Sequence, residues 1–172
     1  MKKLLFLFVF SFAFFSCDDG DLTLEEIDLT SDANASACNL QSGVTLLFKI
    51  NGAETLILEV PEDLIINEVT TENEPRTEEL NSSAFCYYRS FDTPISNTYF
   101  CDELPSDIPI TLEYTAVSGT VEVITTETIV GTTVNSYSHS IVLRDVVFTG
   151  TNGQDVRYTE FIYEESLVTP IE

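Results

Sequence analysis

Basic and metal-binding side chains are scarce in this sequence. Its 172 residues include 7 Lys and Arg against 29 Asp and Glu, so the formal net charge is −22. A chain this acidic is repelled by phosphate backbones, which argues against nucleic acid as a partner. Only one histidine, His139, is present and no CxxC spacing occurs, so the sequence predicts no zinc or other metal site.

Catalytic signatures are also missing. No GxSxG, HExxH, phosphate-loop or GxGxxG pattern occurs. His139 lies in SYSHSIVL with no acidic residue nearer in sequence than Asp145. We therefore expect His139 to be a polar residue on a strand or loop surface and not a general base. These absences predict a non-enzymatic protein without a cofactor.

The first sixteen residues have the anatomy of a signal peptide. Lys2 and Lys3 precede an apolar stretch that ends at Ser16, too short for a spanning helix of roughly 20 residues. Cys17 follows at once, and this arrangement resembles the lipobox of bacterial lipoproteins, with Phe14 standing where Leu is usual. The resemblance implies that Cys17 is acylated, so the chain would be tethered to a membrane by its lipid.

An acidic run follows the cysteine. Asp18, Asp19 and Asp21 resemble the sorting signals that carry lipoproteins of Bacteroidota-type bacteria to the outer face of the outer membrane, with a periplasm-facing location as the alternative. The same residues also suit a solvated tether, because like charges repel and extend a chain. We assign residues 1–16 to the signal, 17–42 to a flexible acidic tether and 43–172 to a β domain.

Alternating apolar residues dominate the sequence from residue 43 onward. Two such runs, 44–50 and 56–60, flank Asn51-Gly52, a strong hairpin signal. Further strands are expected at 84–91 and 97–101, at 110–117 and 121–130 around Ser118-Gly119-Thr120, and at 140–149 and 156–163 around residues 150–153. Weaker pairing segments are expected at 22–29 and 64–69. About eight or nine strands predict an all-β antiparallel sandwich or barrel.

Several segments together resemble a set of uncharacterised small lipoproteins of flavobacteria. They are SCDDGD, Cys38 ahead of the first strand, VTLLFKINGAETLILEV, YYRSFD, NTYFCDELPSDIP and EYTAVSGTVEVITT. The likeness covers most of the mature chain, but its motifs are structural and imply no activity.

Three thiols remain if Cys17 is acylated, so one disulfide and one odd cysteine are expected outside the cytoplasm. The resemblance implies the pair Cys38–Cys101. Local reasoning instead favours Cys86–Cys101, because the two lie on strands expected to be neighbours. Whether Cys86 is free therefore stays open at this point.

Acidic and aromatic clusters are the remaining candidate binding sites. Asp102, Glu103 and Asp107, like Glu164-Glu165, could offer oxygen ligands to calcium, but none has the spacing of a calcium loop, and a solvated acidic surface is the better interpretation. Six aromatic rings lie between residues 85 and 100, where we expect core packing ahead of a sugar or peptide platform, since Trp is absent.

Together these features predict a lipid-anchored outer-membrane protein, exposed at the cell surface, that serves as a binding or envelope-structural module. Its partner would be a protein, peptide or glycan. An accessory subunit of an outer-membrane complex is the alternative, and a small hydrolase is a weaker one.

Overall fold

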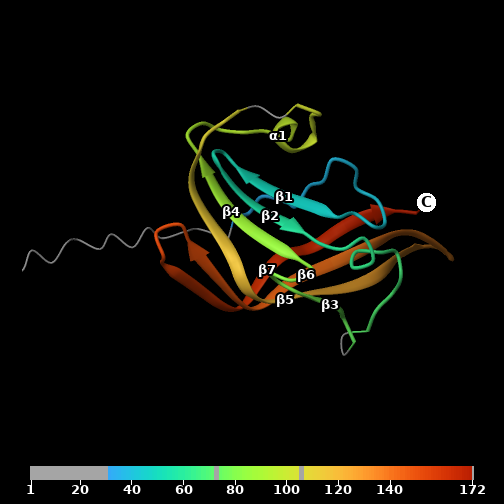
Figure 1. Cartoon of the computed structure of the whole chain (residues 1–172). Helices are drawn as coiled ribbons and strands as arrows, with labels where there is room; N and C mark the ends of the chain where they lie inside the picture. The colour runs from blue at the N-terminus through green and yellow to red at the C-terminus, as the bar shows by residue number, and fades with distance from the viewer. Residues whose placement is uncertain (1–30, 72–73, 105–106, 172) are drawn as a thin grey trace, which may run out of the picture.

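The computed structural model describes residues 31–71, 74–104 and 107–171. They form one antiparallel sheet with a single short helix, which confirms the expected all-β antiparallel class (Figure 1). The elements are β1 (Leu46–Asn51), β2 (Glu54–Glu59), β3 (Arg76–Glu79), β4 (Phe85–Phe91), α1 (Thr98–Cys101), β5 (Ile110–Val130), β6 (Thr133–Gly150) and β7 (Asp155–Pro170).

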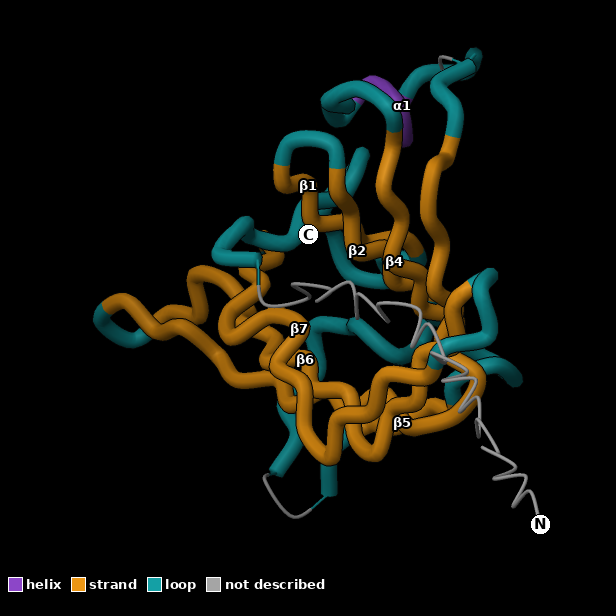
Figure 2. The backbone as a smooth tube through the Cα atoms, turned by 90° about the vertical axis from the view of Figure 1, so that its left-hand side faces the viewer, coloured by secondary structure: helices purple, strands orange, loops and turns teal. Residues whose placement is uncertain are grey.

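The sheet has the strand order β1-β2-β4-β5-β6-β7, and β3 pairs with β5 on the same side as β4. Figure 2 shows the sheet curling, so that β7 comes back towards β1 and β2. Contacts between the two ends of the sheet agree with this shape, because Lys49 of β1 pairs with Glu164 of β7. The result is a half-barrel with its core inside the curl.

Two predicted hairpins are confirmed. β1 and β2 pair from Leu46↔Glu59 to Asn51↔Glu54, and Gly52 supplies the positive φ of 64° at the turn. β6 and β7 meet around the turn before Asp155, as the Gly- and Asn-rich sequence there predicts. Both strands extend well beyond the predicted ranges, because β6 pairs with β5 as far as Thr133.

The hairpin predicted at residues 118–120 is wrong, because β5 runs through it as one strand. Gly119 adopts a φ of +121° within a bulge, where the β5–β6 register shifts twice. A Cβ at Gly119 would lie 2.8 Å from the Arg144 carbonyl oxygen. Glycine therefore lets the backbones of β5 and β6 approach each other, and the bulge bends β5. The first half of β5 pairs with β4 and the second half pairs with β3.

The strand predicted at residues 97–101 is also wrong, since α1 occupies this segment as one helical turn. The amides of Phe100 and Cys101 both bond to the Asn97 carbonyl. The helix places Phe100 in a stacked contact with Phe48, with 4.3 Å between ring centroids, while Tyr99 packs edge-on against Phe91. Long-range aromatic packing thus outweighs local strand preference here.

Apolar side chains fill the inside of the curl. Leu47, Leu58, Cys86, Leu143 and Tyr163 are fully buried there. Alternation places Phe48 and Phe91 on the opposite face of the β1-β2-β4 layer, under α1. That layer is consequently apolar on both faces, and the expectation that the 85–100 aromatics pack as core is met by Tyr88 and Phe91.

The segment assigned to the tether contacts the domain over its described part, residues 31–42. Ser36 and Phe48 exchange two backbone hydrogen bonds of 2.9 Å. Ala35, Ala37 and Leu40 pack against the core. This part of the chain therefore lies between β1 and β7, where the sheet does not close.

Candidate functional site

The outer edge of β7 is the candidate site. β7 is the last strand of the sheet, and within the described chain no strand pairs with its far side. A groove of about 530 Å³ lies there, with Ser31, Asp32, Ala33 and Asn34 on one wall. The opposite wall is β7 itself, from Tyr158 through residues 160–165.

The β7 wall of the groove is formed by consecutive residues. Side chains alternate between the faces of a sheet, so a hollow on one face would be lined by every second residue. All six residues of 160–165 line this groove. Glu160, Phe161 and Ile162 pair regularly with β6 and yet all line the groove, so the groove follows the backbone edge of the strand.

A second groove, of about 420 Å³, continues along the same edge. Residues 164–168 form its β7 wall, and Asn34, Ala35 and Leu40 face them. The two grooves share Asn34, Glu164 and Glu165. They expose the edge from residue 160 to 168, about 30 Å of extended strand. We call this stretch, residues 160–168, the β7 edge.

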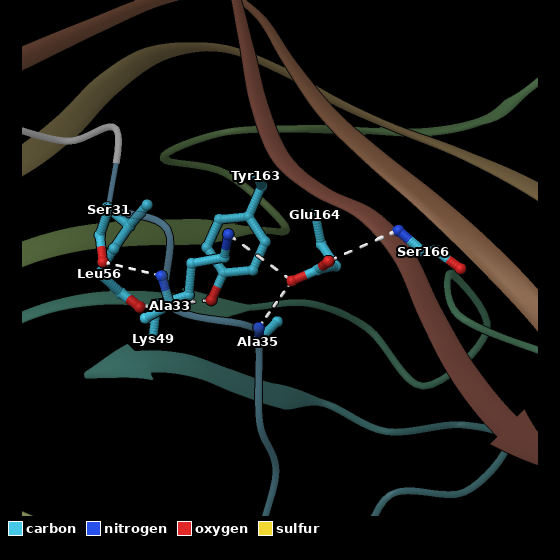
Figure 3. Close-up of polar contacts among 8 residues, drawn as sticks. All are labelled: Ser31, Ala33, Ala35, Lys49, Leu56, Tyr163, Glu164 and Ser166. Carbon is cyan, nitrogen blue, oxygen red and sulfur yellow. Dashed lines mark hydrogen bonds and ion pairs between the residues drawn. The ribbon is translucent and has the colours of Figure 1, made fainter. Parts of the chain in front are cut away.

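Three side chains hold the groove in shape (Figure 3). Glu164 accepts a 2.6 Å hydrogen bond from the Ala35 amide and lies 3.6 Å from the Lys49 ammonium. Tyr163 reaches across the interior to donate to the Leu56 carbonyl at 3.3 Å. Burial raises the pKa of Tyr163, so its phenol stays protonated and keeps that bond. The wall made by residues 31–35 is thus fixed to both ends of the sheet.

The groove is acidic. Asp32, Glu160, Glu164 and Glu165 line it, and Lys49 is the only cation among its described lining residues. Lys49 is engaged by Glu164, and Glu160 pairs with Arg144, which also binds Glu122. Asp32 and Glu165 are exposed. The site therefore carries excess negative charge facing solvent.

The cysteines follow the pairing that the resemblance implied. Cys38 and Cys101 form a disulfide, with Cα atoms 5.3 Å apart. The alternative pair Cys86–Cys101 is wrong, and Cys86 is free and buried. The reason is their placement: Cys86 points into the core, whereas Cys101 lies on α1 over the opposite face.

The sites expected near the N-terminus lie outside the described residues. These are Cys17, the acidic run Asp18, Asp19 and Asp21, and the pairing segment at 22–29.

His139 is buried, so its expected place on a strand or loop surface is wrong. The imidazole is 0% exposed, with Nδ1 2.9 Å from the Thr125 hydroxyl and Nε2 2.8 Å from the Thr169 hydroxyl. Thr125 also receives a 2.5 Å bond from Arg76, and Thr169 donates to Asn67. Both threonines face inward because side chains alternate between the two faces of β5 and β7, and the inner face of each strand lines the curl.

The directions of these hydrogen bonds show which ring nitrogen of His139 carries the proton. Arg76 donates to Thr125, whose proton is then directed to Nδ1, so Nε2 carries the ring proton and donates to Thr169. Burial, with a smaller contribution from the Arg76 charge, lowers the pKa of His139 to about 4. Neutral His139 therefore links β5, β6 and β7 inside the half-barrel.

The edge strand expected at residues 64–69 is wrong, because this segment is a loop held by Arg76. Its guanidinium donates to the backbone carbonyls of Leu64, Ile66 and Glu68. A strand would use such carbonyls in a ladder, so this segment is held as a loop. No sequence signal marked Arg76, Asn67, Thr125 and Thr169 as partners, since they are far apart in the chain.

The described residues contain no group of three or more His, Cys, Asp or Glu side chains arranged to hold a metal ion. In the same part of the chain, no helix is long and apolar enough to cross a membrane.

Comparison with protein-family models, curated proteins and solved structures finds no match to this chain.

Sequence reasoning did not identify the β7 edge as a site. The predicted strand at 156–163 located part of it, but nothing local shows which strand ends a sheet. Three glutamates within residues 160–165 are the signal that could have pointed there, because charged side chains commonly mark edge strands.

Proposed function

We propose that this protein is a lipid-anchored, non-enzymatic binding module that captures an extended polypeptide segment along the β7 edge. The observation that carries the proposal is the groove lined by consecutive residues of β7. An exposed strand edge offers unpaired amides and carbonyls, and a peptide can add to it as a further strand.

The groove suits a strand better than a compact ligand. Together with the second groove it lines β7 from residue 160 to 168. The far wall, residues 31–35, is held by Glu164 and by pairing of Ser36 with β1. This wall leaves the edge accessible while shielding one side of it. An added strand would gain backbone hydrogen bonds from β7 and side-chain contacts from the wall.

Membrane anchoring through Cys17 is the second part of the proposal, supported by the lipobox-like sequence that ends in Ser16-Cys17. We expect Cys17→Ala to move the protein from the membrane pellet to the soluble fraction. Cys86→Ala is the matched control, since Cys86 is buried in the core. Retention of the Cys17→Ala protein in the pellet would contradict acylation.

Surface exposure at the outer membrane is supported by the acidic run after Cys17. Replacing Asp18, Asp19 and Asp21 with Asn should change the protein from protease-accessible on intact cells to protected. Unchanged accessibility would assign the run to a tether.

Strand capture is tested with peptides and the full chain, purified from membranes in a non-ionic detergent. Three nine-residue peptides alternate Val with Lys, Gln or Glu, matching the nine residues of the β7 edge. We expect at least one to bind and to slow amide exchange over residues 160–168 at least tenfold, as new hydrogen bonds form there.

N-methylation of the binding peptide provides the control. Two versions carry methyl groups on the odd or the even amides, which removes the donors along one edge of the peptide without changing its charge. One version should lose binding and the other should retain it. Equal binding of both, or protection located elsewhere in the chain, would refute strand addition.

An accessory subunit of an outer-membrane complex is a second candidate. The tip of the β5–β6 hairpin favours it, because Ile129 and Val130 there are 58% and 65% exposed. Loss of a co-purifying protein on Ile129→Ser/Val130→Ser substitution would support this role.

A further inference from the structure

The charge of the β7 edge restricts what can pair with it. Alternation puts Glu160 and Ile162 on the exposed face of β7. A register shift between Ile162 and Glu164 then sets Glu164 opposite the buried Ile141, and Glu165 is the next exposed acidic residue. Ile162 is 49% exposed between Glu160 and Glu165. An added strand would therefore meet an acidic, an apolar and an acidic side chain in turn along this face.

A second copy of this chain is a poor occupant. Pairing two β7 edges would bring the glutamates of one copy against those of the other, and like charges directly across a ladder are destabilising. The whole chain, at a net charge of −22, adds to this repulsion. The glutamates thus protect the edge from self-association.

The residues that precede Ser31 are a poor occupant for the same reason. The segment 22–29 contains Glu25, Glu26 and Asp28 and no Lys or Arg. Against an edge that already has excess carboxylate, it would add repulsion at each acidic position. A cationic partner is the complementary choice.

We infer, resting on the proposed function, that the β7 edge selects an extended segment with Lys or Arg at alternate positions and an apolar residue between them. The cations lie opposite Glu160 and Glu165, and the apolar side chain covers Ile162. Asp32 on the opposite wall adds to the attraction. Backbone hydrogen bonds to β7 fix where the peptide lies along the edge, and the charged side chains decide which peptide sequences bind.

The test compares the Val/Lys and Val/Gln peptides by fluorescence anisotropy with the same full-length protein. At low salt we expect the Lys peptide to bind at least tenfold more tightly than the Gln peptide. At 0.5 M salt the difference should shrink to about twofold, because exposed charges are screened.

Glu165→Lys is the site variant, since Glu165 is exposed and lines both grooves. Glu127→Lys is the matched control, an equal charge change on the exposed part of β5. We expect Glu165→Lys to weaken Lys-peptide binding about fivefold and to leave Gln-peptide binding within twofold. Glu127→Lys should change either by less than twofold.

The outcomes separate the two proposals. Equal binding of Lys and Gln peptides, with protection of the β7 edge, would overturn the cationic selectivity and leave strand capture standing. Equal weakening by Glu165→Lys and Glu127→Lys would assign the attraction to overall charge and also overturn it. Absence of binding by any peptide would refute capture itself. A dimer that the Lys peptide dissociates would make a second copy the occupant.

Discussion

The buried His139 makes folding stability depend on pH in a defined direction. Its pKa is about 4 in the folded protein against 6.5 for an unperturbed histidine. Between these values the unfolded chain binds a proton that the folded chain does not. The free energy of unfolding contributed by His139 is therefore complete above pH 6.5 and is lost as the pH falls towards 4.

The magnitude follows from the size of the pKa shift. One pKa unit corresponds to about 1.4 kcal/mol, so the full loss is about 3 kcal/mol. About 2 kcal/mol of it falls between pH 7.5 and pH 5. The cause is burial, since a charged imidazolium would lose its hydration inside the half-barrel, and the nearby Arg76 charge adds a smaller repulsion.

Urea unfolding followed by circular dichroism measures this loss. Carboxylates also titrate at low pH, so His139→Gln is the reference, because its amide can accept from Thr125 and donate to Thr169. We expect the wild type to lose about 2 kcal/mol more than His139→Gln between pH 7.5 and pH 5. Equal losses, or an imidazole NMR titration near 6.5, would refute the buried neutral state.

Three further predictions concern packing and thiols. In urea unfolding, Gly119→Ala should lower the free energy of unfolding by about 3 kcal/mol, because its Cβ would lie 2.8 Å from backbone atoms of β6. Gly131→Ala should lower it by about 1 kcal/mol, because no atom lies within 4 Å of the added Cβ. Similar costs would contradict the close approach. Replacing Cys38 and Cys101 with Ala should cost about 4 kcal/mol, since the bond closes a loop with a sequence separation of 63, and a loss below 1 kcal/mol would count against it. Cys86 should resist thiol reagents until the protein unfolds, because it is fully buried and burial raises its pKa; rapid labelling of the native protein would refute this.

The β1–β2 hairpin was predictable because it depends on neighbours in sequence. The β1–β2 hairpin follows from alternating side chains on either side of Asn51-Gly52, where glycine adopts the positive φ of the turn. Gly119 shows the limit of such reasoning. Its sequence context predicts a turn, but β6 pairs with β5 on both sides of Gly119, from Tyr114 to Val130, and this makes it a bulge.

The sequence by itself determined the all-β class, since two-residue periodicity and turn residues act locally and do not depend on the rest of the chain. Tertiary structure alone decided the placement of His139, the failure of Cys86 to reach Cys101, and the open edge of β7. The first and the last depend on how the sheet curls, which brings residues 30 to 129 positions apart into contact. The cysteine pairing depends on α1 lying over the face of the layer opposite to Cys86. The curl results from the sum of long-range pairings and bulges, and no local pattern encodes that sum.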